Sequence, residues 1–163
     1  MRKVILLPII ILFFPSTLWA SDPFIGTWEL NVAKSKFPAA FLEALGIAEP
    51  KQETIVIREL DNDELEAIVT GHYIDGSLNS KRQLVPKQGG IVRFQQGGPP
   101  NGCYYVETKI SEKKKYRTLL VNGKQSLVMQ IVISQDGKEM NLTITGMDNQ
   151  GKPFEGLYFF ERQ

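Results

Sequence analysis

The sequence predicts an all-β domain, an antiparallel up-and-down barrel of about 8–10 strands with a short helical lid after the first strand. Three observations carry this prediction. Apolar and polar residues alternate with a period of two from residue 24 almost to the C-terminus. The alternating runs are short, evenly spaced and separated by turn residues, which is typical of consecutive hairpins. A meander of this length has two unpaired edges unless it closes, and closure removes both.

The alternation sets the expected strands. In the first, at 24–32, Phe24, Trp28 and Leu30 share one face. About nine further strands are expected from residue 52 onward. They lie at 53–60, 64–73, 77–85, 90–96, 103–110, 116–121, 124–134, 139–146 and 153–162. Asn122-Gly123 predicts a type I′ hairpin, because both residue types tolerate the positive φ that this turn requires.

A short helix is expected between the first two strands. Pro38 precedes a run of helix-forming residues, and Gly46 follows it. Phe41, Leu42 and Leu45 are spaced to form one apolar stripe. We predict two to three helical turns that cover the barrel as a lid, with Phe41 and Leu45 at the portal. Plain core packing of these side chains is compatible with that role.

Residues 1–20 have the pattern of a secretory signal peptide. Arg2 and Lys3 precede an apolar stretch, and small residues surround a plausible cleavage point after Ala20. The apolar stretch is shorter than the roughly 20 residues that a membrane span needs. We therefore expect residues 21–163 to form one exported domain, periplasmic or extracellular, with no stable membrane span. A retained N-terminal anchor is the alternative.

Composition limits the partners. Residues 21–163 carry 17 basic and 18 acidic side chains, so no basic excess is present to bind nucleic acid. The run Lys113-Lys114-Lys115 is interpreted as a solvated hairpin tip. Cys103 is the only cysteine, so an internal disulfide is impossible and stability must come from packing. We expect a monomer.

Three segments carry a resemblance to a known superfamily. They are residues 24–30 (Phe-Ile-Gly-Thr-Trp-Glu-Leu), 35–37 and 41–47. The chain resembles the calycins, which include lipocalins and fatty-acid-binding proteins. Residues 31–37, 146–152 and 160–163 also resemble small exported bacterial proteins of unknown role. The calycin resemblance implies a barrel around a cavity that binds a small hydrophobic or amphipathic, lipid-like molecule.

The resemblance also implies how one end of the barrel closes. Calycins pack the first-strand tryptophan, here Trp28, against a basic residue of the last strand. Arg162 has the same strand parity as Phe154 and Tyr158 and can therefore point inward. A Trp28–Arg162 cation–π contact would contribute about 0.5–2 kcal/mol. Contact of Trp28 with a ligand is the alternative.

Arg117 and Arg93 are the candidate polar anchors for a ligand. Fatty-acid-binding proteins commonly place Arg-x-Tyr in the last strand, whereas Tyr158-Phe159-Phe160 stands here, so the anchor is sought elsewhere. An inward arginine would be a costly buried charge that an anionic ligand offsets, and its planar fork suits a carboxylate. For both arginines an outward orientation is the alternative.

Other side chains are weaker candidates. Tyr158 is expected to orient a polar ligand group, as tyrosines in barrels can, although aromatic residues also simply fill space. Arg58 and Arg82 are expected to face solvent.

Catalytic signatures are lacking in the sequence. His72 is the only histidine, and one histidine with one distant cysteine gives no metal-ligand spacing. No nucleophile elbow or phosphate-binding glycine loop occurs. We predict a binding protein without metal or cofactor. A filled barrel that acts as a structural or protein-interaction module is the first alternative. A lyase or isomerase that uses His72 or an interior tyrosine is the second.

Overall fold

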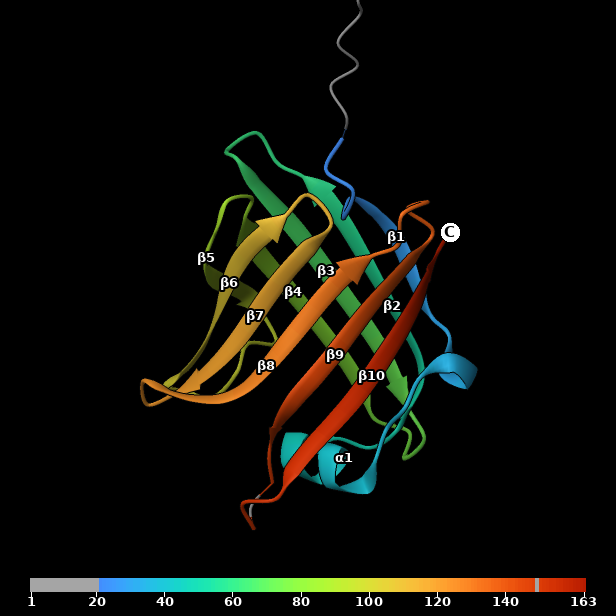
Figure 1. Ribbon diagram of the computed structural model, residues 1–163, viewed down its shortest axis with the longest axis vertical. Helices are drawn as coiled ribbons and strands as arrows, with labels where there is room; N and C mark the ends of the chain where they lie inside the picture. Colours follow the sequence, from blue (N-terminus) through green and yellow to red (C-terminus); the bar gives the residue numbers. More distant parts are fainter. Residues whose placement is uncertain (1–20, 149) are drawn as a thin grey trace, which may run out of the picture.

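The computed structural model describes residues 21–148 and 150–163, which form a closed antiparallel barrel (Figure 1). Each strand pairs with its neighbours in sequence, and the first strand pairs with the last. The strands are β1 (Gly26–Leu30), β2 (Pro50–Glu59), β3 (Glu64–Tyr73), β4 (Leu78–Pro86), β5 (Gly89–Gln96), β6 (Cys103–Ser111), β7 (Lys114–Val121), β8 (Lys124–Ile133), β9 (Glu139–Met147) and β10 (Pro153–Arg162). The predicted fold class is confirmed.

The predicted signal peptide, residues 1–20, lies outside the described residues. Within the part of the chain that the structure describes, no helix is both long and apolar enough to cross a membrane.

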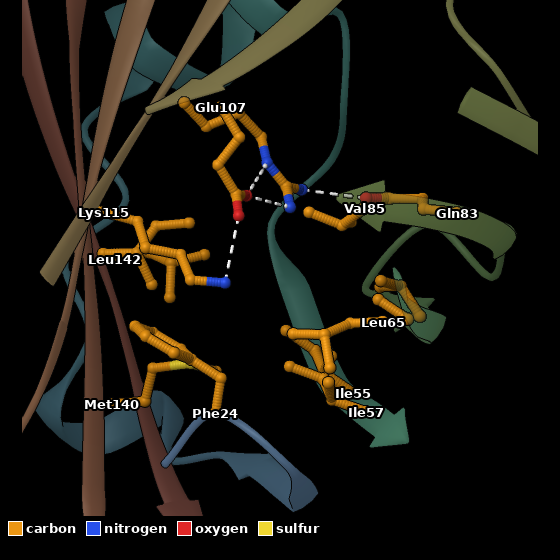
Figure 2. Close-up of a pocket in the computed structure, with 14 residues that line it drawn as sticks. Phe24, Ile55, Ile57, Leu65, Gln83, Val85, Glu107, Lys115, Met140 and Leu142 are labelled. Atoms are coloured by element: carbon orange, nitrogen blue, oxygen red, sulfur yellow. Dashed lines mark hydrogen bonds and ion pairs between the residues drawn. The ribbon is translucent and has the colours of Figure 1, made fainter. Parts of the chain in front are cut away.

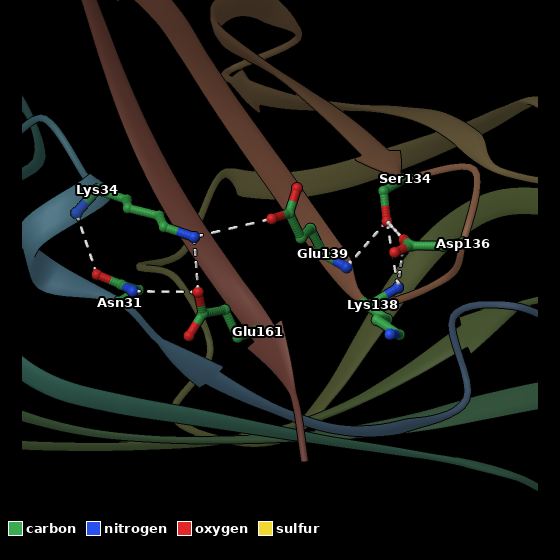
Figure 3. A network of polar contacts seen from close by, with 7 residues as sticks. All are labelled: Asn31, Lys34, Ser134, Asp136, Lys138, Glu139 and Glu161. Carbon is green, nitrogen blue, oxygen red and sulfur yellow. Dashed lines mark hydrogen bonds and ion pairs between the residues drawn. The ribbon is translucent and has the colours of Figure 1, made fainter.

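The first strand ends two residues earlier than the alternation predicts. Asn31 accepts a hydrogen bond from the backbone N–H of Lys34 (3.1 Å) and so begins the short 3-10 helix η1 (Val32–Lys34). Lys34 also pairs with Glu161 of β10 (2.8 Å), and Asn31 donates to the same carboxylate (Figure 3). This network holds the turn after β1 against the last strand, so Val32 does not extend the strand.

The hairpin between β7 and β8 has the expected turn. Asn122 and Gly123 adopt φ values of 50° and 77°, the left-handed region that a type I′ turn needs at both positions.

Trp28 and Arg162 close one end of the barrel. The fully buried Trp28 ring lies 4.2 Å from the Arg162 guanidinium carbon, as the parity argument expects. The Trp28 indole N–H donates to the carbonyl of Phe24 (2.9 Å). Arg162 donates in addition to the backbone carbonyls of Pro23, Ile25 and Gly137. This end is therefore held by hydrogen bonds as well as by apolar packing.

The helix α1 (Ala39–Leu45) covers the opposite end of the barrel (Figure 1). It follows Pro38 and ends at Gly46, whose φ of 62° is left-handed. The N–H of Ile47 donates to the carbonyl of Leu42 (3.1 Å), which completes the helix C-terminus. Phe41 is fully buried, with edge contacts to the rings of Phe154 and Tyr158 on β10. The predicted helical lid is present and its central aromatic side chain belongs to the core.

The lid depends on a glycine beneath it. A Cβ atom at Gly156 would lie 2.8 Å from carbons of the Phe41 ring, closer than packed carbon atoms approach. We expect Gly156→Ala to lower the free energy of unfolding by about 1–3 kcal/mol, because the lid must shift to relieve the contact. Urea unfolding measures the change. Combining it with Phe41→Leu should recover part of the loss, and an unchanged stability for Gly156→Ala alone would contradict this packing.

Candidate ligand site inside the barrel

Two adjoining cavities lie in the barrel interior. The larger, about 190 Å³, is at the lid end and touches Leu45 of α1. The smaller, about 60 Å³, lies toward the closed end beside Phe24 and is mainly apolar. Five side chains lie at the boundary between the two cavities and line both of them. They are Ile55, Val69, Gln83, Arg117 and Leu142. The interior therefore runs from a chamber of mixed apolar and polar lining under the lid to a small, mainly apolar space.

A buried ion cluster forms part of the boundary between the cavities. The Glu107 carboxylate accepts from Arg117 Nη2 at 2.7 Å and from its Nε at 3.1 Å. Lys115 Nζ lies 3.1 Å from the other carboxylate oxygen, as Figure 2 shows. Arg117 Nη1 donates to the amide oxygen of Gln83 on β4 (2.8 Å). Glu107 and Lys115 are each only 3% exposed. One carboxylate thus holds two cations, which leaves the cluster with a net positive charge.

The cluster keeps Glu107 ionised. Burial acts to raise the pKa of its carboxyl group, but the charges and hydrogen bonds of Arg117 and Lys115 outweigh burial and leave the pKa below its usual value. Lys115 also lies 4.2 Å from the centroid of the Phe24 ring, on the side of the smaller cavity.

A second group of polar side chains lines the larger cavity only. It includes Glu53 of β2, Lys81 of β4 and Tyr158 of β10. Tyr73 and Asn79 are also there and bond to each other, with Asn79 Nδ2 3.2 Å from the Tyr73 hydroxyl. Burial raises the pKa of Glu53 to about 7, although the charge of Lys81 opposes this. Burial likewise lowers the pKa of Lys81 and raises that of the Tyr158 hydroxyl.

The structure brings three of the predicted ligand residues to the cavities. Arg117 lines both of them, and Tyr158 and Leu45 line the larger one. Phe41 lies under the lid, packed on β10. Of the two orientations that the sequence left open for Arg117, the inward one is observed.

Arg93 faces the outside of the barrel, so its choice as an interior anchor is wrong. Its side chain is 59% exposed, and its Nη2 lies 2.6 Å from a carboxylate oxygen of Glu64. The neighbouring Val92 takes the inward position and is buried. Arg58 and Arg82 are also outside, where both bind the carboxylate of Glu66. Their expected outward orientation is observed.

Several side chains of the interior are not among the predicted site residues. They are Glu53, Lys81, Gln83, Glu107 and Lys115. Lys115 lies inside the barrel, so the prediction of a solvated hairpin tip at residues 113–115 is wrong for this residue. Strand β7 starts at Lys114 and gives Lys115 the same inward parity as Arg117. Parity also indicates the inward position of Glu53, because it lies two residues before the inward-facing Ile55 on β2 and therefore on the same face of the strand.

A metal site requires several ligating side chains close together. Within residues 21–148 and 150–163 no three His, Cys, Asp or Glu side chains are placed to hold a metal ion. His72 is exposed on β3.

The closed ten-stranded meander, with a lid between β1 and β2 and cavities inside, defines a calycin-type barrel. Wild-type fluorescent protein UnaG has a similar fold, with 15% identity, a TM-score of 0.59, and coverage of 86% of this chain and 97% of that one. Zebrafish ileal bile acid-binding protein complexed with cholic acid gives 14% identity and a TM-score of 0.46, with coverage of 86% and 99%. No family model matches the chain, and a search of curated proteins gives no significant match. At these identities the likeness shows the fold alone.

Proposed function

We propose that the protein binds a small hydrophobic or amphipathic molecule inside the barrel. The observation that carries this proposal is the larger cavity, where apolar walls surround a few polar groups, the usual composition of a small-molecule site. Burial of the ligand's apolar surface would supply most of the affinity, at about 25 cal/mol per Å².

Arg117 is the proposed polar anchor. A guanidinium group has five N–H donors, and here three of them bind Glu107 and Gln83. The other two have no acceptor among the described residues, and Arg117 lines both cavities. The net positive charge of the cluster favours an anionic or strongly accepting ligand group. Tyr158 would contact the ligand from β10. Leu45, with α1 held by Phe41, would form the portal through which the ligand enters.

Residues 1–20 support the further proposal that this binding takes place after export, in the periplasm or outside the cell. We propose that the protein acts there as a monomer. Export would bring the protein into contact with ligands other than those of the cytosol.

Native mass spectrometry of the protein purified from its own host tests the binding proposal. We expect a retained small molecule, and a clear loss of occupancy for Arg117→Met. Arg93→Met is the matched control, because Arg93 has the same side chain on the outer face and should leave occupancy unchanged. Circular dichroism verifies that both variants keep the barrel. Equal occupancy in the two variants would remove Arg117 as the anchor.

A filled barrel with a structural or protein-interaction role is the second candidate. The cavities of about 190 and 60 Å³ favour it, since ligand pockets more commonly measure about 300–1,000 Å³. Absence of any retained molecule, together with no binding of the fluorescent apolar probe anilinonaphthalene sulfonate, would favour this candidate and contradict ligand binding.

A further inference from the structure

Two charged side chains that line the larger cavity, the buried Glu53 and the partly buried Lys81, have no hydrogen-bond or ion-pair partner among the described residues. Glu53 is 8% exposed and lines the cavity wall. Within the described part of the chain, its carboxylate takes part in none of the hydrogen bonds or ion pairs. An ionised carboxylate that is largely buried and receives no donor from the described residues is costly, so a ligand that donates to it from the cavity would stabilise it.

The backbone makes room for this carboxylate. Glu53 lies opposite Gly71 in the β2–β3 register. A Cβ atom at Gly71 would lie 3.3 Å from Glu53 Oε2 and 3.5 Å from the Tyr73 ring. The absence of a side chain at Gly71 therefore lets the carboxylate occupy the cavity wall beside Tyr73.

Lys81 is the complementary charge on another wall. It lines the same cavity from β4, and among the described residues its ammonium group forms no hydrogen bond or ion pair. Glu53 and Lys81 attract each other across the cavity but do not meet in an ion pair. The larger cavity therefore has a free acceptor on one wall and a free cationic donor on another.

We propose that the larger cavity selects a compact amphoteric ligand, one that offers a hydrogen-bond donor to Glu53 and an anionic group to Lys81 from an apolar body. This inference rests on the proposed binding function. It assigns Glu53 and Lys81 as specificity-determining residues. Such a ligand pairs with both charges, whereas a ligand with one polar group leaves the other charge without a partner.

The cavity volume fits this ligand class. About 190 Å³ is the space of roughly six water molecules at liquid density, which suits a compact molecule and excludes an extended lipid chain without rearrangement. Leu45, Phe94 and Met129 supply apolar lining for its body. A site with built hydrogen-bonding groups discriminates strongly against analogues that lack the matching group.

Three matched probes test the proposal by calorimetry at about pH 8.5, where Glu53 is mostly ionised. Phenylalanine carries both an ammonium and a carboxylate group, phenylpropionate lacks the ammonium, and phenethylamine lacks the carboxylate. We expect phenylalanine to bind at least about tenfold more tightly than either analogue. In the Glu53→Gln variant, phenylalanine should no longer bind more tightly than phenylpropionate. In the Lys81→Met variant, phenylalanine should no longer bind more tightly than phenethylamine. Arg93→Met should change neither ratio.

The comparison among probes needs only the wild-type protein, so a variant that fails to fold leaves the test intact. Equal affinity for phenylalanine and phenylpropionate, or no binding of any of the three, would overturn the amphoteric ligand class. If anilinonaphthalene sulfonate or a retained host molecule still binds in that case, the proposed function stands without this inference. If nothing binds, both fail.

Discussion

Replacing Glu107 with glutamine is expected to destabilise the barrel by about 3–5 kcal/mol, the largest effect of any single polar substitution that we predict. Glu107 is the carboxylate that pairs with both Arg117 and Lys115 in the interior. Glutamine keeps the shape but removes the charge, so the buried Lys115 and the partly buried Arg117 lose their only counter-ion within the cluster. Urea unfolding at neutral pH measures the loss.

A matched exposed substitution separates this effect from a general effect of losing one acidic residue. Glu161 pairs with Lys34 at the surface, and Glu161→Gln should change stability far less, because water screens that pair. Adding Lys115→Met to Glu107→Gln should recover part of the loss, since one of the two unpaired cations is then removed. A loss below about 1 kcal/mol for Glu107→Gln would contradict the structural role of the cluster.

The cluster also gives the protein a defined acid sensitivity. The pKa of Glu107 is lower in the folded protein than in the unfolded chain. The ionised carboxylate therefore stabilises the fold at pH values above its pKa in the unfolded chain, and this contribution is lost as the pH falls to its lower pKa in the folded protein. The stability of wild-type protein should therefore fall more steeply in acid than that of Glu107→Gln.

The fold could be predicted from the sequence because its signals are local. Alternation identifies a strand from its own residues, and Asn122-Gly123 fixes a turn without reference to the rest of the chain. The lid was equally local, since Pro38 and Gly46 bound it at the two ends. Val32 was the exception, because Asn31 caps a 3-10 turn there through contacts with distant Glu161.

The site could be predicted only in part, because alternation divides a strand into two faces without saying which is inside. Arg117 and Arg93 have similar sequence surroundings, yet one enters the interior and the other faces water. Whether such an arginine points inward depends on the position of the carboxylate with which it pairs, and spacing along one strand does not show that position. Arg117 meets Glu107, its cross-strand neighbour, in the interior, whereas Arg93 meets Glu64 on the outside. Charged residues inside a barrel become predictable only when pairs of strands are compared.

Replacing Glu53 with glutamine is expected to stabilise the protein in alkaline solution. The pKa of Glu53 rises from its usual 4.5 to about 7 on folding, because burial disfavours the charged form. The folded state therefore holds this proton more tightly, and wild-type stability falls as pH rises from about 4.5 to 7. The cost of the ionised carboxylate above that range is about 3 kcal/mol. Glutamine cannot ionise, so Glu53→Gln avoids this cost.

Unfolding in urea at several pH values measures the difference. It should approach about 3 kcal/mol above pH 8 and vanish below about pH 4.5, where the wild-type carboxyl group is protonated in both states. Lys81, Tyr73 and Tyr158 face the same group, and Lys81 moderates the effect. Identical pH dependence in the two proteins would mean that Glu53 is not desolvated. A ligand that donates to Glu53 would offset the same cost, so the substitution that stabilises the empty barrel is the one expected to weaken its selectivity.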